Sequence, residues 1–177
     1  MLNYKKLDIE YKHVSEKILN YITDNNVILS SRSFWHNAGH FVNTIPELQQ
    51  MFDPLNLTVT DVSILATNET TAIHVDSSNC NIREESIRIN FPIINCENTI
   101  TKFYHTEFKG MVTKLPNSLG FTHFHANKCK LIDSYELTQP TVIRVNVPHQ
   151  VCVTDPMLLR IACTVFFKQN LEFLLEH

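Results

Sequence analysis

Glycine is scarce in this sequence of 177 residues, which contains only three. It has neither a glycine-rich phosphate-binding loop nor a GxSxG motif, so the usual sequence signals of a P-loop nucleotide site and of an α/β-hydrolase are absent. The five cysteines are odd in number and none has CxxC spacing: Cys80, Cys96, Cys129, Cys152 and Cys163. We therefore expect neither a disulfide framework nor a zinc ribbon, and we expect a reducing compartment.

Long hydrophobic runs and an excess of basic charge are also missing. No segment approaches the roughly 18 apolar residues that cross a bilayer, and residues 1–12 lack the apolar core of a signal peptide. The formal net charge of −3 gives no general signal for nucleic-acid binding, although it leaves room for a local basic patch. A cytoplasmic protein without a membrane segment is expected, and its oligomeric state is left open.

What is present is typical of one folded domain. Hydrophobic residues make up 44% of the chain and charged residues 19%, which fits a globular protein rather than a disordered one. We expect a single domain over residues 1–177. Within it, a helical N-terminal segment (1–56) should pack on a β-rich core (57–168), followed by a C-terminal tail (169–177).

Apolar spacing predicts two helices in the N-terminal segment. The second begins at Thr44, where Thr44-Ile-Pro-Glu47 has the spacing of a capping box and Pro46 suits a first turn. The first lies near residues 6–23, and its apolar face recurs at spacings of three and four: Leu7, Tyr11, Val14, Ile18 and Ile22.

From residue 57 the pattern changes to short β-type runs separated by Asn, Pro and Ser. Residues 109–128 fit neither period and are expected to form a long insert near one mouth of the barrel. The expected strands are Thr58–Ala66, Thr71–Val75, Ile87–Ile94, Thr99–His105, Lys130–Leu137, Thr141–Val147, Gln150–Val153 and Leu159–Lys168. Short strands that follow two helices favour a mainly β fold with flanking helices: a double-stranded β-helix, or jelly roll, of cupin-like type.

The pair His74-Val-Asp76 is the most informative motif. Side chains at positions i and i+2 of a strand point to the same face, so His74 and Asp76 can converge on one ion. His149 lies 75 residues after His74 and would arrive on another strand, with Pro148 suiting a strand start. Two histidines and one carboxylate leave three octahedral positions open, as in non-haem Fe(II) oxygenases. The alternative is that both histidines are ordinary, internally satisfied side chains.

Arg160 begins the alternating run Arg160-Ile-Ala-Cys-Thr-Val-Phe-Phe, in which apolar residues dominate both faces. An unpaired arginine in such surroundings is costly, and a bidentate carboxylate would relieve the cost. That carboxylate could belong to an anionic cosubstrate or to an Asp or Glu of the protein.

Residues from about 58 to 168 resemble the 2-oxoglutarate- and Fe(II)-dependent dioxygenases, and within them the aspartyl/asparaginyl β-hydroxylase-like branch. The matching stretches are VSILATNETTAIHVDSSN, RINFPIIN, VPHQV and LLRIACTVFF. The resemblance implies Fe(II) at His74, Asp76 and His149, and it implies that Arg160 holds the distal carboxylate of 2-oxoglutarate. It also assigns Ser63 to the cosubstrate and Arg88 to the active-site surroundings.

The sequence departs from this branch at three positions. The hydroxylases that name the branch have a glycine where Asp76 stands, so this chain has the fuller triad of the wider superfamily. Asn90 replaces a histidine of the branch, and it shares a strand face with Arg88. Ala162 stands where many members carry Ser or Thr.

Further histidines allow other metal sites. His123-Phe-His125 with Cys129 could ligate zinc, or it could be a chance cluster near the substrate mouth. His36 and His40 have helical i, i+4 spacing but lack the glutamate of a zincin motif, and we expect residues 35–40 to form a loop.

The favoured interpretation is a hydroxylase that uses Fe(II), 2-oxoglutarate and O2 on an unidentified protein side chain or small molecule. The alternatives are a non-catalytic jelly-roll binding module and a cupin-type metalloenzyme that does not use 2-oxoglutarate.

Overall fold

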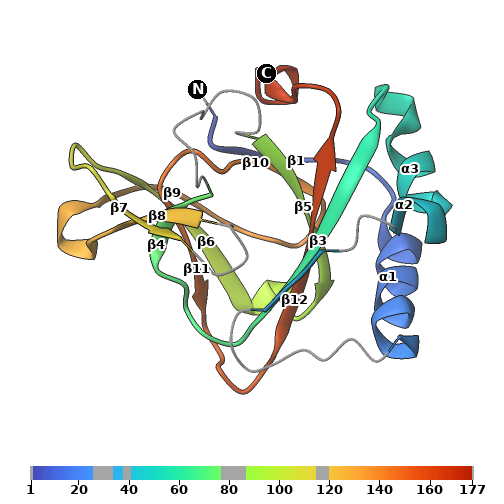
Figure 1. The fold of residues 1–177 in the computed structure, drawn as a ribbon, viewed down its shortest axis with the longest axis horizontal. Coiled ribbons are helices and arrows are strands. Elements are labelled where there is room, and N and C mark those ends of the chain that lie inside the picture. Colours follow the sequence, from blue (N-terminus) through green and yellow to red (C-terminus); the bar gives the residue numbers. More distant parts are fainter. Residues whose placement is uncertain (1, 26–33, 38–40, 77–86, 115–119, 177) are drawn as a thin grey trace.

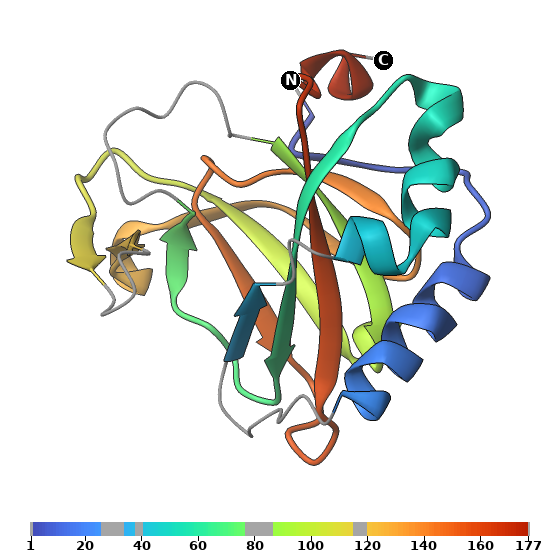
Figure 2. The same cartoon turned by 45° about the vertical axis from the view of Figure 1, so that its right-hand side comes forward.

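The strands form two antiparallel sheets with the helices on one side, as the computed structural model shows (Figures 1 and 2). The structure describes residues 2–25, 34–37, 41–76, 87–114 and 120–176. This is the expected mainly β, jelly-roll architecture with flanking helices.

The first sheet carries the helices. Its central strand β12 pairs with β3 on one side and β5 on the other, both antiparallel. Its six strands run in the order β1 (Tyr4–Lys6), β10 (Thr141–Arg144), β5 (Ile87–Ile94), β12 (Arg160–Phe167), β3 (Val59–Thr67) and β2 (Phe34–Asn37).

The second sheet carries the HxD motif. It also has six strands, in the order β7 (Met111–Lys114), β8 (Gly120–Phe124), β4 (Ile73–Val75), β11 (His149–Val153), β6 (Thr99–His105) and β9 (Lys130–Glu136). In the described part of the chain, short 3-10 helices join the main elements: η1 (Asp53–Leu55), η2 (Cys96–Asn98), η3 (Ala126–Lys128) and η4 (Glu172–Leu175).

The larger hydrophobic core lies between the helices and the first sheet. The helices are α1 (Lys12–Asp24), α2 (Phe41–Thr44) and α3 (Pro46–Phe52). The apolar stripe of α1 is buried, and it packs in one cluster with α3 and with the outward-facing residues of β3, β5 and β12. Its fully buried members include Val14, Ile18, Leu48, Phe52, Val62, Ile64, Ile89, Phe91 and Val165.

A second, smaller core lies between the two sheets, because its members come from both. Phe103 and Tyr135 belong to the second sheet, whereas Ile143 and Ala162 belong to the first. Tyr4 of β1 stacks on Tyr135 with 4.6 Å between ring centroids, so the N-terminal strand closes one side of this interior.

The structure corrects several details of the predicted elements. Residues 4–6 form β1 rather than the start of a helix, and α1 begins only at Lys12. Residues 34–37 form β2 where a loop was expected. The expected insert at 109–128 contains the hairpin of β7 and β8.

The predicted capping box at Thr44 is also wrong. Ile45 is the N-cap of α3, and no side-chain capping bond is made there among the described residues. Pro46 does occupy the first turn, as expected. No helix within the described ranges is both long and apolar enough to span a bilayer.

Candidate metal centre

His74 and Asp76 lie at one end of β4. His74 is in the strand and Asp76 follows its last residue, so the i, i+2 spacing places both side chains on one side. The backbone N–H of Asp76 donates to the carbonyl oxygen of Val145 at 3.0 Å. This bond ties the carboxylate to the chain that leaves β10 and so holds it between the two sheets.

His149 begins β11 directly opposite His74. The two residues form the cross-strand pair of β11 and β4, and their ring centroids are 4.5 Å apart. The backbone N–H of Tyr104 donates to the Pro148 carbonyl at 2.7 Å, which fixes the entry into β11. The ring of His149 is 5% exposed and lies 6.2 Å from the ring of Phe103.

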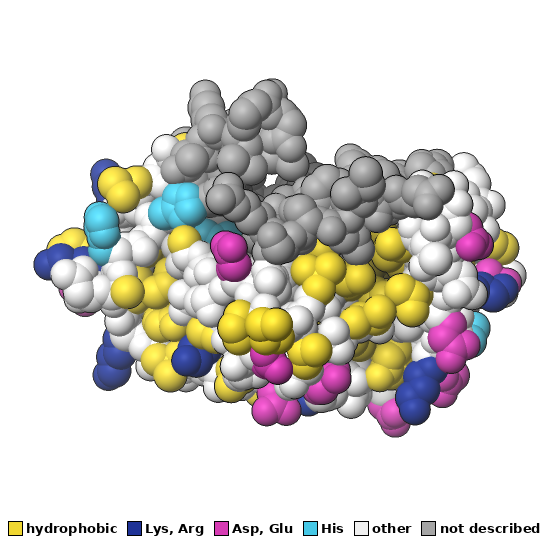
Figure 3. All heavy atoms as spheres, turned by 90° about the horizontal axis from the view of Figure 1, so that it is seen from below, with side chains coloured by type: hydrophobic (Ala, Val, Ile, Leu, Met, Phe, Trp, Pro, Cys, Tyr) yellow, Lys and Arg dark blue, Asp and Glu magenta, His cyan; other side chains and the backbone are white. Residues whose placement is uncertain are grey.

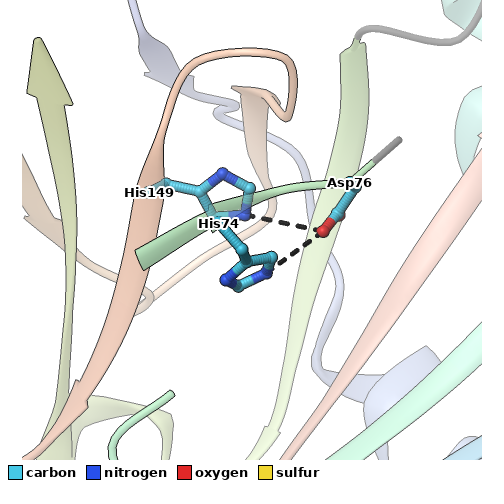
Figure 4. Close-up of side chains that lie close together, drawn as sticks. All are labelled: His74, Asp76 and His149. Carbon is cyan, nitrogen blue, oxygen red and sulfur yellow. Dashed lines mark ion pairs between the residues drawn. The ribbon is translucent and has the colours of Figure 1, made fainter. Parts of the chain in front are cut away.

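The ligand atoms of these three residues converge (Figure 4). Oδ1 of Asp76 is 3.2 Å from Nε2 of His74 and 3.9 Å from Nε2 of His149. Among the described residues they form the group that could hold a metal ion, with all three ligand atoms within 4.8 Å of one another. Ligand atoms at right angles around an ion, each about 2.1 Å from it, lie about 3 Å apart, so His149 would have to move toward the other two ligands by about 1 Å or more to bind a six-coordinate ion with them.

Backbone carbonyls orient both imidazoles. Nδ1 of His74 is 2.8 Å from the oxygen of Ala72, and Nδ1 of His149 is 2.9 Å from the oxygen of Val147. Because a carbonyl only accepts, each Nδ1 carries the proton, and each Nε2 is left to bind an ion. Metal-binding histidines in proteins are commonly oriented by such a bond.

The protonation states also suit a metal. Burial, together with the charge of His74, lowers the pKa of His149 to about 4. Burial would raise the pKa of Asp76, but the hydrogen bond from His74 and the nearby positive charges lower it to about 2. Burial also opposes protonation of His74, yet Asp76 raises its pKa. At neutral pH, His149 is therefore neutral and Asp76 ionised, as metal ligands must be.

Arg160 lies deep in the interior at the start of β12 and is only 1% exposed. Among the described residues, its Nε and Nη1 have no hydrogen-bond partner. The salt bridge to a protein carboxylate, which the sequence left open, is therefore not made there. A buried guanidinium in this state is costly unless an anion enters beside it.

Tyr135 is a second buried polar group of this interior, and it was not among the residues predicted for the site. Its hydroxyl is buried without a hydrogen-bond partner in the described part of the chain. Burial raises the pKa of Tyr135 to about 12 against the opposing effects of Thr101, Arg160 and Asn90, so these groups lie near one another. Its alternation with Leu137, which is also buried, could have marked it as inward-facing.

Ser63 and Asn90 lie on either side of Thr164. Thr164 of β12 is the register partner of both residues, and directly opposed residues of neighbouring strands share a face. The hydroxyl of Thr164 donates to Oδ1 of Asn90 at 3.0 Å. Both predicted residues thus lie on the same inner face of the first sheet as Arg160.

Arg88 lies at the other end of this face. Its guanidinium is 4.5 Å from the ring centroid of Phe166, and its charge contributes to the lowered pKa of Asp76. Phe103 and Tyr135 connect the ligand group with Arg160. The ring centroid of Phe103 is 6.2 Å from that of His149 and 6.1 Å from that of Tyr135, and the charge of Arg160 acts on the pKa of Tyr135.

The other predicted histidine sites are not assembled. His123, His125 and Cys129 form no group of three converging ligands among the residues that the structure describes. His123 instead pairs with His74 across β8 and β4. His36 lies in β2, and His40 lies outside the described residues.

Comparison with known proteins identifies structures that have the same fold. No protein-family model and no curated protein matches the sequence. Solved structures do match. The non-haem α-ketoglutarate-dependent carbocyclase SnoK of nogalamycin biosynthesis has a TM-score of 0.54 at 11% identity, over 93% of this chain and 79% of its own.

Two further structures support the same fold. The epimerase SnoN, solved with Fe3+, α-ketoglutarate and nogalamycin RO, has a TM-score of 0.57 at 9% identity, over 93% of this chain and 78% of its own. A prolyl hydroxylase from Trichoplax adhaerens, solved with a peptide fragment of hypoxia inducible factor, has a TM-score of 0.50 at 13% identity, over 99% and 87%. This chain thus has a jelly-roll fold that α-ketoglutarate-dependent oxygenases also have.

Proposed function

We propose that this protein is a non-haem Fe(II)- and 2-oxoglutarate-dependent oxygenase that hydroxylates a C–H bond of a protein side chain or a small molecule. One combination of observations supports the proposal. The ligand group of His74, Asp76 and His149 lies at the mouth of the space between the two sheets. The same space holds the buried guanidinium of Arg160, which has two unpartnered nitrogens.

The residues fit Fe(II). Two imidazole nitrogens and one carboxylate oxygen are the ligand set of non-haem Fe(II) oxygenases, and three positions stay open for other ligands. When bound, the iron would let O2 oxidise both 2-oxoglutarate, to succinate and CO2, and the substrate, from C–H to C–OH. His74, Asp76 and His149 would hold the iron, and the carbonyls of Ala72 and Val147 would keep the two rings aligned.

Arg160 would bind the distal carboxylate of 2-oxoglutarate. Its two unpartnered nitrogens supply the donors that a carboxylate accepts, and Tyr135 supplies a further hydroxyl near the same place. Ser63 and Arg88 would contact the cosubstrate nearer to the metal, and Asn90 would act there with Thr164. The apolar residues Phe103, Ile143 and Ala162 would exclude water around it.

The finer assignment is to the aspartyl/asparaginyl β-hydroxylase-like branch. Its support is the order of the HxD, VPHQV and LLRIACTVFF motifs, since the structural neighbours belong to other kinds of oxygenase. These neighbours were solved with a small molecule and with a peptide, so both substrate classes remain in the proposal. The protein would act as a single domain in a reducing cytoplasm, as the odd number and the spacing of its cysteines favour.

Two measurements on one sample test the proposal: its visible absorption spectrum without oxygen, and succinate formation after oxygen is admitted. Fe(II) and 2-oxoglutarate added without oxygen should give a weak visible charge-transfer band, and admission of O2 should give succinate. His13→Ala, which removes an exposed histidine of α1 outside the ligand group, is the matched control for His149→Ala. A folded protein that shows neither the band nor succinate contradicts the proposal.

A further inference from the structure

Positive charge is concentrated in one segment of this otherwise acidic protein. Residues 99–132 hold five of the fifteen lysine and arginine residues but only one of the eighteen acidic residues. The segment therefore has a formal charge of +4, and the rest of the chain has −7. Figure 3 shows basic and histidine side chains with few acidic ones toward its left edge, the side of β7 and β8 in Figure 1, whereas toward the lower centre and right acidic side chains are mixed with basic ones.

Exposed apolar side chains belong to the same part of the chain, on the two end strands of the second sheet, β7 and β9, and on the loop before β7. We call residues 105–114 and 120–132 the basic lobe. Lys109, Lys128 and Lys130 are exposed on it. Among the described residues, five of the nine exposed large apolar side chains also belong to it: Phe108, Met111, Val112, Leu131 and Ile132. Single exposed apolar residues are ordinary, but a concentration of them marks an interaction surface.

Contacts within the lobe hold its loops together. The hydroxyl of Thr106 donates to the carbonyl oxygen of Lys128 at 2.9 Å, and Nζ of Lys128 lies 4.6 Å from the ring centroid of Phe108. These contacts join the loop before β7 to η3. Gly110 lets β7 approach β8, because a Cβ there would lie 2.6 Å from the oxygen of His123. The surface is therefore largely formed before any partner binds.

The basic lobe and the metal centre share one face of the second sheet. Met111 of β7 is opposite His123 of β8, His123 is opposite His74, and His74 is opposite His149. Residues that are directly opposite on neighbouring strands point to the same face of a sheet. His123 and Met111 thus extend the row of the two histidine ligands outward, and a ligand lying along this row would reach the ion.

We propose that the basic lobe docks the substrate and that this substrate is an acidic peptide segment of a protein. The segment would cross Met111 and His123 and bring one residue to the metal. Lysines beside exposed apolar side chains complement a peptide that mixes acidic and apolar residues. The inference rests on the proposed oxygenase function and names its substrate class.

Two observations favour a peptide over other polyanions. In the described structure β7 is the end strand of its sheet, so its outward backbone groups can pair with an extended peptide but not with a lipid headgroup. Residues 99–132 contain no arginine, and the chain carries a net charge of −3, whereas nucleic-acid sites are rich in arginine and lie on basic domains.

Fluorescence anisotropy on the full chain tests the docking surface. The probe is a labelled peptide of repeated Glu-Leu-Glu-Ser units, with Mn(II) in place of Fe(II) and 2-oxoglutarate present. The comparison probes are the same peptide with lysine for glutamate, single-stranded oligodeoxythymidine, and vesicles of phosphatidylserine and phosphatidylcholine. The lobe variant is Lys109→Glu/Lys130→Glu, and its control with equal net charge is Lys12→Glu/Lys168→Glu; all four lysines are exposed.

The lobe variant should bind the acidic peptide more weakly by on the order of tenfold, and the control by less than about twofold. Equal loss in both variants overturns the proposal, as does equal or tighter binding of the lysine peptide, the oligonucleotide or the vesicles. Succinate formation is measured separately. Fe(II)-dependent succinate without lobe-dependent binding overturns the docking surface alone, and lobe-dependent binding without succinate overturns the oxygenase function alone.

Discussion

His149 is the direct cross-strand partner of His74, with 4.5 Å between their ring centroids. The pairing joins two segments that are 75 residues apart in the chain. Each ring bonds a backbone carbonyl two residues before it, just ahead of its strand, and this bond fixes the ring orientation. The two histidines of the candidate metal centre are therefore part of the sheet, and Asp76 directly follows β4.

Removing any one of the three proposed ligands should end metal-dependent turnover. His74→Ala, Asp76→Ala and His149→Ala each leave two ligands, too few to hold the ion in an open site. The fold should survive, because the two main cores do not depend on these side chains. Metal content and circular dichroism of each variant check this, with His13→Ala as control. Iron-dependent 2-oxoglutarate turnover at the parent level in all three variants would refute the assignment.

Replacing Arg160 should separate stability from cosubstrate binding. Arg160→Met removes a buried charge with two unpartnered nitrogens, so the cosubstrate-free protein should become more stable by about 1–4 kcal/mol. The same variant should need more 2-oxoglutarate by about 10- to 150-fold, since a charge-assisted contact contributes about 1.5–3 kcal/mol.

Arg160→Lys should restore affinity only in part, because an ammonium lacks the planar fork of a guanidinium. Ser63→Ala should act in the same direction but less strongly. Urea unfolding and a 2-oxoglutarate titration measure both effects. A destabilised Arg160→Met protein with an unchanged 2-oxoglutarate requirement would make Arg160 a structural residue.

Tyr135→Phe should weaken 2-oxoglutarate binding with little loss of stability. Its hydroxyl lies near Thr101 and Asn90 but makes no hydrogen bond of ordinary geometry within the described structure, so its removal should cost little stability. One lost hydrogen bond to the cosubstrate should raise the requirement by about twofold to tenfold. Tyr104→Phe is the matched control, because that hydroxyl donates to Gln150 at 2.9 Å. If the control weakens cosubstrate binding as much as Tyr135→Phe does, the role of Tyr135 is wrong.

Glu172 should stabilise the fold in a pH-dependent way. The hydrogen bond from Arg144, 3.0 Å from Nη1 to Oε2, lowers the pKa of Glu172 in the folded state. Its contribution is therefore present above the unfolded pKa of about 4.3 and is lost as the pH falls below it. The stability difference between Glu172→Gln and the parent should be largest at neutral pH and shrink in acid.

The control is Glu47→Gln, at the exposed pair with Lys17, which should change stability little. A difference that does not vary with pH excludes the ion pair as its source.

Gly110→Ala should displace β7 from β8. The added Cβ would meet the backbone oxygen of His123 at 2.6 Å and Cγ2 of Thr122 more closely still, and a backbone atom cannot easily move aside. Amide hydrogen exchange should rise in Met111–Lys114 while metal binding is kept. Unchanged protection of these amides would show that the hairpin tolerates the methyl group.

The sequence predicts the strands whose side chains alternate and whose ends carry turn residues. The bounds of β5 and β6 agree with those predicted, because Asn95 follows the alternating run of β5 and Asn98 precedes that of β6. The sequence does not predict β1, because these residues form a strand only through their pairing with β10, where Tyr4 lies opposite Ile143. The sequence does not predict the β7–β8 hairpin either. The consecutive apolar residues Met111 and Val112 are both exposed, so β7 lacks the alternation of apolar and polar residues that identifies a strand.

The same reasoning applies to the candidate site. His74 and Asp76 can be found from local spacing, and His149 and Arg160 from the order of motifs along the chain. Tyr135 could not be selected in that way, because its place depends on the packing of β9 against β6 and on the stacked ring of Tyr4. Local patterns thus predict the ligands on strands, and tertiary packing decides which polar groups share the interior with them.

The most direct test of the central claim is the thermal stability of the protein with and without 2-oxoglutarate, under anaerobic Fe(II). At 100 times its dissociation constant, the cosubstrate should stabilise the fold by about 2.7 kcal/mol. The stabilisation should require both the metal and Arg160, so it should vanish on chelation and in Arg160→Met. A folded, iron-loaded protein whose stability does not respond to 2-oxoglutarate would contradict the account.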